Sequence, residues 1–521
     1  MKNILKVNKC LISVSDKTQI VNFAENLNRE NVKIISTGNT FNKLLEKGIK
    51  VKKVESVTKF PEILQGRVKT LHPKIFGGIL GDPNNSSHKK DMNQHNLSKF
   101  ELVIVNLYPF ESTIEQTKNI NTCIENIDIG GPSLIRAAAK NFLSTAIVVD
   151  VNDYNKILNE IKKYGGISLS LRKILAVKAF KTTMKYDSII TNWMQDNFDS
   201  TESEDLTLLG KKISTLRYGE NPHQRASIYG LTKNNDLFYE KLNGKELSYN
   251  NLNDLKLGIK LSAEFIDPSC VIIKHAIPSS VAEAGDIFSA WKKAFNADSL
   301  SAFGGVVIFN KTVDEKLAKT LINVFLELIV APNFTKKALN IFSKKKNLRI
   351  IKIRNIKKII KNYKQEFSLL PNCMLVQDVD NQKVTVKNLK IVSKRKPSKR
   401  EVEDLIFAFR VVKYVRSNAI VIAKNKTTIG IGSGNTSRVD SVQFAIIKAR
   451  RAFKGNKKNL SGSVLASDAF FPFSDSIKLA RSANISSIIQ PGGSINDRKV
   501  IESTNKEKIS MVFTGKRCFS H

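Results

Sequence analysis

The chain has 521 residues, enough for two to four domains at about 150 residues each. Hydrophobic residues make up 41% and charged residues 25%, a balance that is typical of globular proteins and excludes a wholly disordered chain. Lys and Arg total 84 against 47 Asp and Glu, giving a formal net charge of +37. Such an excess is compatible with nucleic acid, an anionic membrane surface or small anionic substrates. Because the Lys residues are spread along the whole chain, we favour a solvated basic surface.

Strand and helix patterns alternate through the first third of the chain. Strands are expected at 11–14, 33–35, 102–105 and 146–149, and helices at 18–27, 41–47 and 133–141. Alternation at this spacing predicts a parallel sheet covered by helices on both faces. A long helix with apolar periodicity, expected at 168–196, closes this region.

A polar, locally acidic segment follows at 197–206 and is expected to be a linker. It separates an N-terminal domain over 1–199 from a C-terminal region over 200–521. The C-terminal region is also mixed, with strands expected at 270–273, 305–309, 419–422 and 485–490. The Lys-dense stretch 344–364 has one aromatic residue, so an exposed amphipathic edge is favoured there over a polyanion patch. No internal repeat with a fixed period is visible.

The cysteines and histidines give no sign of a metal site or a disulfide framework. The five cysteines are far apart and the six histidines lack metal-ligand spacing, so we expect no zinc and a reducing compartment. The N-terminus carries Lys every few residues and offers no signal-peptide core. No apolar run approaches the ~20 residues that cross a bilayer. A cytoplasmic protein without membrane contact is therefore expected.

Five polar runs in the N-terminal domain indicate a ligand site at the carboxyl edge of the expected sheet. These runs are 13–17, 36–40, 66–73, 106–110 and 126–133. Hydroxyl groups and free amides where a strand meets a helix favour phosphate. Asp128 precedes two glycines at a helix entry, and Arg136 and Lys140 share one face of that helix. Together the runs predict a site for a phosphorylated small molecule.

In the C-terminal region, Lys274 and His275 end an apolar strand. Acyl transfer needs a proton acceptor and a cation near the developing oxyanion, and an adjacent Lys and His can supply both. Neighbouring side chains on a strand point to opposite faces, so the pair converges only if an irregular turn follows. A structural histidine remains the alternative. The glycine-rich run 429–438 lacks the G-x-G-x-x-G spacing, so no dinucleotide site is expected.

Eleven runs, in order along essentially the whole chain, resemble the bifunctional purine-biosynthesis family that joins IMP cyclohydrolase to AICAR transformylase. The runs are 13–17, 66–73, 106–110, 127–140, 216–224, 274–278, 301–304, 417–418, 467–473, 490–494 and 517–521. The resemblance implies an α/β protein. Its N-terminal parallel-sheet domain would be similar to methylglyoxal synthase, and its C-terminal transformylase region would consist of two cytidine-deaminase-like α/β units without zinc.

The resemblance also implies the chemistry and its residues. A formyl group would pass from 10-formyltetrahydrofolate to AICAR, and formyl-AICAR would then close to IMP with loss of water. For formyl transfer, it implies His275 as the base, Lys274 at the oxyanion or the leaving nitrogen, and Asn418 at the formyl carbonyl. Substrate or folate binding is implied for Arg217, Tyr218, Phe473, Arg517, Phe519 and His521. For ring closure, proton and oxyanion roles are implied for Lys69, Tyr108, Asp128 and Lys140. Phosphate and ribose binding is implied for Ser13, Lys17, Ser36, Thr37, Gly38, Thr40, Arg67 and Thr70.

The same resemblance implies a homodimer whose transformylase sites draw on both subunits, a folate co-substrate, and no permanently bound cofactor, nucleic acid or membrane. Three positions depart from the family pattern. Ile277 replaces Asn or Ser, Ser280 replaces Gly, and Asn39 replaces the second Gly of the phosphate loop. Two alternatives therefore stay open: an active cyclohydrolase with an impaired transformylase half, suggested by Ile277, and a basic nucleic-acid-binding protein.

Overall fold

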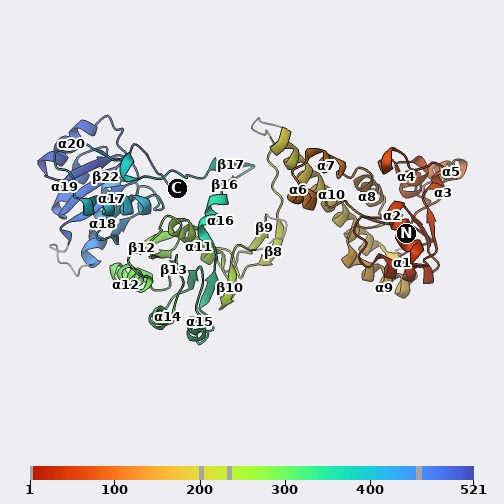
Figure 1. Ribbon diagram of the computed structural model, residues 1–521, viewed down its shortest axis with the longest axis horizontal. Coiled ribbons are helices and arrows are strands. Elements are labelled where there is room, and N and C mark those ends of the chain that lie inside the picture. The colour runs from red at the N-terminus through yellow and green to blue at the C-terminus, as the bar shows by residue number, and fades with distance from the viewer. Residues whose placement is uncertain (1–3, 199–204, 232–236, 453–459) are drawn as a thin grey trace. The chain divides into compact units, whose positions relative to one another are not determined.

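The computed structural model describes residues 4–198, 205–231, 237–452 and 460–521 (Figure 1). The chain divides into two compact units, Met1–Leu209 and Gly210–His521. This division falls ten residues after the expected domain boundary at 199, and most of the expected linker at 197–206 lies outside the described residues.

A five-stranded parallel sheet forms the centre of the N-terminal unit, with strand order β4-β3-β2-β5-β6. Its strands are β2 (Lys9–Val14), β3 (Lys33–Ser36), β4 (Val51–Lys53), β5 (Leu102–Asn106) and β6 (Ala146–Val148). The short strands β1 (Ile4–Leu5) and β7 (Ile167–Ser168) pair with each other. Helices cover both faces of the sheet, so its central strands are nearly continuous apolar runs, as expected from the sequence.

The helices of this unit place two N-termini at the carboxyl edge of the sheet. The helices are α1 (Ile20–Arg29), α2 (Gly38–Glu46), α3 (Glu55–Thr58), α4 (Pro73–Leu80), α5 (Ser86–Gln94), α6 (Phe110–Gln116), α7 (Ile120–Glu125), α8 (Gly130–Lys140), α9 (Tyr154–Tyr164) and α10 (Leu169–Phe198), with the 3-10 turns η1 (Leu64–Gly66) and η2 (Val151–Asp153). The helix α2 starts directly after β3, and α8 leads back to β6, so both begin at the edge where parallel strands end.

The C-terminal unit contains two six-stranded sheets with the same topology. Their strand orders are β10-β15-β14-β13-β11-β12 and β18-β23-β22-β21-β19-β20. The first sheet consists of β10 (Glu240–Asn243), β11 (Ser269–Lys274), β12 (Ile277–Glu283), β13 (Val306–Phe309), β14 (Leu328–Ala331) and β15 (Arg349–Lys352). The second consists of β18 (Lys390–Ile391), β19 (Ile420–Ala423), β20 (Thr428–Gly432), β21 (Ser463–Ser467), β22 (Ile485–Gln490) and β23 (Ser510–Phe513). Parallel and antiparallel pairs occur in the same order in both, so the sheets form an internal repeat.

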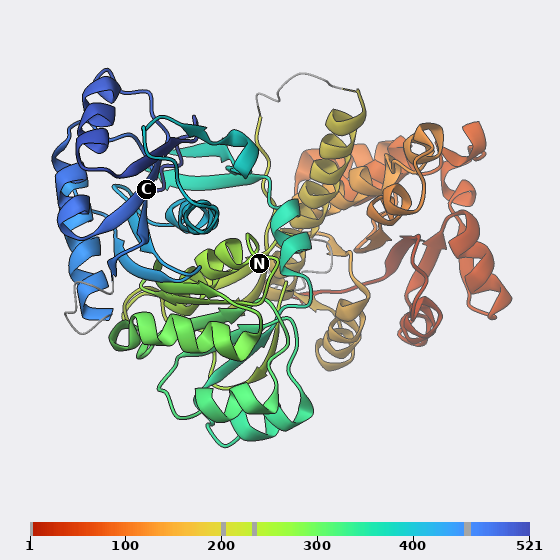
Figure 2. The same cartoon turned by 60° about the vertical axis from the view of Figure 1, so that its left-hand side comes forward.

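Helices pack on both sheets and fill the space between them (Figure 2). They are α11 (Tyr249–Ser262), α12 (Ile287–Ala297), α13 (Ser299–Ala302), α14 (Glu315–Leu321), α15 (Lys336–Phe342), α16 (Ile356–Asn362), α17 (Lys399–Val412), α18 (Arg438–Ala452), α19 (Asp475–Ser482) and α20 (Asp497–Lys506), with the 3-10 turn η3 (Val386–Asn388). Leu255 of α11 and Leu405 of α17 are fully buried in one core shared by both repeats. Two hairpin pairs complete the unit: β8 (Lys211–Thr215) with β9 (Ser227–Gly230), and β16 (Gln365–Leu370) with β17 (Cys373–Asp378).

The edge strands β12 and β20 of the two repeats lie side by side. The Val281 main-chain N–H donates to Thr428 Oγ1 at 2.8 Å, and Ala282 forms an antiparallel bridge with Thr427. The two strands are antiparallel, so Ile277 at the start of β12 lies near the end of β20.

Two sequence expectations for this unit are wrong. The stretch 344–364 is not an exposed edge throughout, because β15 is an interior strand whose Ile350 and Ile351 are fully buried. An internal repeat does exist: the equivalent hairpins start at Lys274 and Lys424, 150 positions apart. The repeat is not visible in the sequence because the two halves share a fold but have few residues in common. The two repeated α/β sheets agree with the fold implied by the family resemblance.

Candidate functional site

In the N-terminal unit, the segment before α4 lies against the N-termini of α2 and α8. A Cβ placed on Gly38, which begins α2 with φ +38°, would lie 3.3 Å from Lys69 Nζ. A Cβ placed on Gly130, which begins α8, would lie 3.4 Å from Thr70 Oγ1. An ammonium group and a hydroxyl therefore adjoin two helix N-termini, where free amides attract anions.

The hydroxyl groups expected to bind phosphate are gathered near the start of α2, and most are already hydrogen-bonded. Ser13 Oγ and Thr37 Oγ1 lie 3.0 Å apart. Ser36 Oγ and Thr40 Oγ1 donate to main-chain carbonyls of β2 at 2.8 and 2.9 Å, and both side chains are buried. Ser36 and Thr40 thus fix the loop to the sheet.

Three expected cations in this unit have defined partners. Lys17 Nζ donates to the Ser15 carbonyl at 3.2 Å. Arg67 forms an ion pair with Glu125 between two mostly exposed side chains. Lys69 Nζ lies 2.9 Å from a carboxylate oxygen of Glu62, and its side chain is about three-quarters buried at 26% exposure. Lys69 is thus the more enclosed of the two ion-paired cations.

Asp128 lies at the entry to α8, among the residues expected for ring closure. Its carboxylate accepts from the Gly131 N–H at 2.8 Å, and its own N–H donates to Tyr186 Oη at 2.8 Å. Burial raises the pKa of Asp128 above its ordinary value, although the amides of Gly131 and Tyr108 and the charge of Lys69 oppose this rise. Burial also raises the pKa of Tyr186 to about 12. The structure therefore brings Asp128, Tyr108 and Lys69 to one place.

Lys140 lies far along α8 from Asp128. It ends α8, and a rise of ~1.5 Å per residue puts about 15 Å of helix between it and Gly130.

His72, another residue of the expected runs, has a structural role as the N-cap of α4: its Nδ1 accepts from the Lys74 N–H at 3.1 Å.

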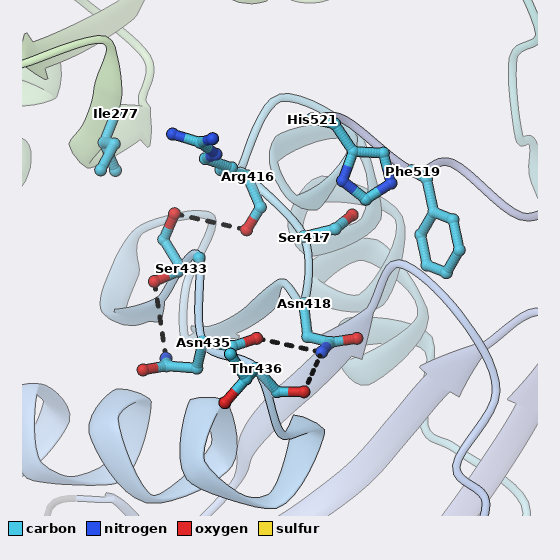
Figure 3. A pocket seen from close by; sticks show the side chains of 10 residues that line it. Ile277, Arg416, Ser417, Asn418, Ser433, Asn435, Thr436, Phe519 and His521 are labelled. Carbon is cyan, nitrogen blue, oxygen red and sulfur yellow. Dashed lines mark hydrogen bonds between the residues drawn. The ribbon is translucent and has the colours of Figure 1, made fainter.

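The C-terminal unit has two adjoining cavities, of about 550 and 490 Å³, that share Asn418, Thr436 and Phe519. The first, shown in Figure 3, is lined by Ile277, Arg416, Ser417, Asn418, Ser433, Gly434, Asn435, Thr436, Phe519 and His521. The second is lined by Asn418, Thr436, Ser437, Arg438, Val439, Ala469, Phe470, Pro472, Phe473, Asp475, Ser476, Arg517 and Phe519. Five residues expected from the sequence thus meet here: Asn418, Phe473, Arg517, Phe519 and His521.

The side chain of Asn418 stands between the cavities and is held on both sides. Its Nδ2 donates to the carbonyls of Asn435 and Thr436 at 3.0 and 3.2 Å (Figure 3). Its Oδ1 accepts from Arg438 Nη2 at 2.8 Å, and Arg438 forms a buried ion pair with Asp468. The sequence patterns do not indicate a role for Arg438 or Asp468, although these residues lie in the runs 429–438 and 467–473.

The C-terminal tail is tied to the same place. Ser417 Oγ donates to Asp468 Oδ2 at 2.5 Å and accepts from the Ser520 N–H at 3.2 Å. The Arg517 guanidinium lies 4.6 Å from the centre of the Phe519 ring, and the ring centres of Phe519 and His521 are 5.5 Å apart. The buried Asp468 therefore positions both Asn418 and the tail.

Lys274 and His275 lie at the turn between β11 and β12, next to the first cavity. Lys274 pairs with Ile277 across a two-residue turn in which His275 and Ala276 have φ of 56° and 55°. His275 therefore lies in the turn itself and not on the strand. His275 is exposed, and Lys274 Nζ donates to the Phe303 carbonyl at 2.7 Å. Ile277, which follows directly, lines the cavity with a side chain that forms no hydrogen bonds.

Arg217 and Tyr218 are paired outside these cavities. They follow β8, and the Arg217 guanidinium lies 5.3 Å from the centre of the Tyr218 ring. Within the described parts of the chain, no group of three His, Cys, Asp or Glu side chains is placed to hold a metal ion. In the same parts, no helix is long and apolar enough to span a membrane.

Comparison with known proteins gives consistent matches along the chain. The family described as "AICARFT/IMPCHase bienzyme" matches residues 138–448, and the "MGS-like domain" matches residues 19–133. The chain is 47% identical to the "Bifunctional purine biosynthesis protein PurH" of Caldicellulosiruptor saccharolyticus, over 98% of this chain and 99% of the relative. It is 44% identical to the protein of the same name from Acetivibrio thermocellus, over 99% of this chain and 100% of the relative. A solved structure described as "Crystal structure of ForH" is 30% identical, covering 36% of this chain and 97% of its own, at a TM-score of 0.33.

Proposed function

The chain belongs to the family of AICARFT/IMPCHase bienzymes, and on this premise we propose how its two units divide the chemistry. The enzyme transfers a formyl group from 10-formyltetrahydrofolate to AICAR and closes the product to IMP. We assign formyl transfer to the C-terminal unit and ring closure to the N-terminal unit. The observation that carries this assignment is that each unit has its own polar site, built from the residues that match the family runs.

For formyl transfer, the 5-amino nitrogen of AICAR attacks the formyl carbon of the folate. That amine is a weak nucleophile because its lone pair is delocalised into the imidazole carboxamide. His275 takes the amine proton as the new C–N bond forms, and Lys274 stabilises the oxyanion or protonates the departing folate nitrogen. Asn418, fixed by Arg438, orients the formyl group between the two cavities.

For ring closure, the carboxamide nitrogen of formyl-AICAR attacks the formyl carbon, and the formyl oxygen leaves as water. The carboxamide nitrogen and the formamido nitrogen each give up one proton, and the C=N bond of the new ring forms. Asp128 accepts the proton of the attacking nitrogen, which its raised pKa favours. Lys69 and Tyr108 stabilise and protonate the oxygen. The phosphate binds at the N-terminus of α2, near Lys69, and Thr70 adjoins the N-terminus of α8. A role for Lys140 stays a separate prediction, because this residue ends α8 at the far side from Asp128.

The assignment is tested by two assays on the full chain. One supplies AICAR with 10-formyltetrahydrofolate, and the other supplies formyl-AICAR. His275→Ala is expected to lower formyl transfer by roughly 10²–10⁴-fold, the usual contribution of a general base, and to leave ring closure intact. The exposed His95, changed to Ala, is the matched control. Equal loss of both activities in folded His275→Ala protein would contradict the division of labour.

We further propose that the enzyme is a cytoplasmic homodimer with folate as co-substrate and no permanently bound cofactor. The dimer is supported by the β16–β17 hairpin, which exposes five large apolar side chains: Phe367, Leu369, Leu370, Leu375 and Val376. Leu369 is 82% exposed, which is unusual for a residue flanked by other apolar side chains. In addition, Arg217 and Lys274 line neither cavity of a single chain.

The dimer is tested by Leu369→Glu together with Val376→Glu, two exposed positions on one face of the hairpin. Charges on this face oppose its burial against a second subunit, so sedimentation should show the mass of a monomer. Formyl transfer should fall and ring closure should persist. An unchanged dimer mass would exclude the hairpin from the interface, and a monomer mass for the unmodified chain would contradict the dimer itself.

A further inference from the structure

Two aspartates occupy equivalent places in the internal repeat of the C-terminal unit. Asp254 lies on α11, six residues after the N-cap Ser248, and Asp404 lies on α17, six residues after the N-cap Ser398. Both N-cap serines form capping boxes, so the two helices start in the same way. Each repeat therefore has one carboxylate, and the two carboxylates lie at equivalent positions relative to the hairpins of their own repeats.

Each carboxylate accepts hydrogen bonds from the main chain of a two-residue turn. Asp404 accepts from the N–H groups of Asn425 and Lys426 at 2.8 and 2.6 Å. Asp254 accepts from the Ala276 N–H at 2.6 Å. Burial raises the pKa of Asp254, and the Ala276 amide, the charge of His275 and the His275 amide oppose this rise. Asp254 thus interacts with both residues of the turn that carries His275.

The two turns differ in how well their residues suit the backbone. All four turn residues have φ between 53° and 56°, in the left-handed region that Gly, Asn and Asp adopt most easily. The second turn has Asn at its first position. The first turn has His275, a residue type that also occurs in this region more often than most, and Ala276, which has no such preference. In the first turn, Ala276 is therefore the residue whose conformation most needs support, and its N–H donates to Asp254.

We propose that Asp254 is a positioning residue for formyl transfer, which holds the His275–Ala276 turn so that the imidazole faces the substrate. Asp404 holds an equivalent turn that carries no proposed catalytic side chain. The inference rests on the proposed role of His275. Asp254 acts through the main chain and does not itself touch the reacting atoms.

The experiment compares four variants of the full chain: Asp254→Ala, Asp254→Asn, Asp404→Ala, and Asp254→Ala combined with Ala276→Gly. Asp254→Ala should lower kcat of formyl transfer at least tenfold and change KM for AICAR less than threefold. Asp254→Asn keeps one acceptor oxygen and should lose less. Adding Ala276→Gly should recover at least threefold of the lost kcat, because Gly adopts the left-handed conformation without strain. A residue needed only for the packing of α11 would not be rescued in this way.

Asp404→Ala is the matched control for a general loss of stability. It should lower the melting temperature and leave formyl transfer within about twofold of the unmodified enzyme at a temperature where it is folded. Ring closure should be unchanged in every variant, which reports that the N-terminal unit is intact. If Asp254→Ala does not fold, the comparison of Asp254→Asn with Asp254→Asn plus Ala276→Gly replaces it.

The His275→Ala variant distinguishes failure of the positioning role of Asp254 from failure of the proposed function. If His275→Ala abolishes formyl transfer and Asp254→Ala stays within twofold, the positioning role is wrong and the proposed function stands. If His275→Ala has no effect, the proposed role of the histidine is itself wrong. Equal losses of kcat in Asp254→Ala and Asp404→Ala, without rescue by Ala276→Gly, would overturn the inference in favour of a structural role.

Discussion

Single residues in both sites are held in place by hydrogen bonds and ion pairs with other groups of the protein. The buried Asp468 has no exposed surface, and through Arg438 and Ser417 it fixes Asn418 and the C-terminal tail. In the N-terminal unit, the Gly131 amide fixes the carboxylate of Asp128. Rigid placement of this kind holds reacting groups in a productive geometry before the substrate arrives.

Asp128→Asn is expected to remove most of the ring-closure activity without lowering the free energy of unfolding at neutral pH. Burial raises the pKa of Asp128 in the folded chain, so its charged form is disfavoured by folding, and this penalty grows as the pH rises through that pKa. A neutral amide removes the penalty. Ring closure should fall at least about 10²-fold because the base is lost. In the unmodified enzyme, activity should fall as the pH drops through the raised pKa. Formyl-AICAR kinetics and thermal melting at several pH values measure these effects.

Asp153→Asn is the control for this prediction. Asp153 is also buried, but its oxygens lie 2.9 and 2.5 Å from the ammonium groups of Lys156 and Lys178. Loss of these charge-assisted contacts should lower the free energy of unfolding by about 1–3 kcal/mol. A melting temperature that falls more in Asp128→Asn than in Asp153→Asn would contradict the prediction.

Ile277→Asn should improve the use of AICAR. Ile277 lines the first cavity beside the proposed base and cannot hydrogen-bond through its side chain, whereas the family pattern has Asn or Ser there. One new hydrogen bond contributes about 0.5–1.5 kcal/mol, so kcat/KM for AICAR should rise up to roughly tenfold. Ile277→Val changes size without adding a polar group and should bring no gain. Equal kcat/KM values for the Asn and Val variants would show that polarity at this position does not matter.

At the scale of elements, the sequence predicts what apolar periodicity can reveal. The strands β2, β3, β5 and β6 and the helices α1, α2, α8 and α10 lie within a few residues of their expected positions, because their apolar patterns are strong. The helix α5 has no buried residue and therefore has no such pattern. The β16–β17 hairpin is a separate two-stranded sheet, and the ion pair of its Glu366 with Lys260 of α11 joins residues far apart in the chain, which local sequence cannot identify.

The candidate sites were predictable to a similar extent. Polar runs with Gly indicated Lys69 and Asp128, and the end of an apolar strand indicated His275. The family resemblance implied Asn418. The sequence gives no sign of Arg438, because its significance comes from an ion pair with a residue 30 positions away, which only tertiary packing reveals. The position of Lys140 at the far end of α8 likewise follows from helix length, which the motif alone does not convey.

Gly432→Ala should impair formyl transfer through a displaced helix. A Cβ on Gly432 of β20 would lie 2.0 Å from the main-chain oxygen of Ser441 in α18, so the helix must move away. Ser441 Oγ donates to the Asn418 carbonyl at 2.8 Å, and Arg438 begins the same helix. Such overpacking costs about 1–3 kcal/mol, and formyl transfer should fall at least tenfold while ring closure persists.

Gly285→Ala is the matched control, because no atom lies within 4 Å of a Cβ at that position and its φ is not in the left-handed region. Its melting temperature and both activities should match those of the unmodified enzyme. Formyl transfer in Gly432→Ala that equals that of Gly285→Ala would show that α18 can shift without consequence for Asn418.

On the scale of the whole molecule, the positive charge suits an enzyme whose substrates are anionic. The formal net charge of +37 raises the local concentration of phosphorylated and carboxylated small molecules near the surface. This attraction is long-range and is screened by salt. The charge therefore has a physical use without a nucleic-acid partner, and no nucleic-acid motif is needed to account for it.

The two activities should be separable at the division after Leu209. Among the residues that the structure describes, the main core of the N-terminal unit, from Val7 to Ala179, is built only from residues of that unit, and the cores of the C-terminal unit begin at Leu247. A chain that buries its own core can fold alone. Residues 1–209 should therefore keep ring closure of formyl-AICAR within about threefold, and residues 210–521 should keep formyl transfer to AICAR. Circular dichroism and cooperative melting of each piece report folding. A folded N-terminal piece without ring closure would mean that this site needs residues of the other unit, and recovery of activity on mixing the two pieces would identify that need directly.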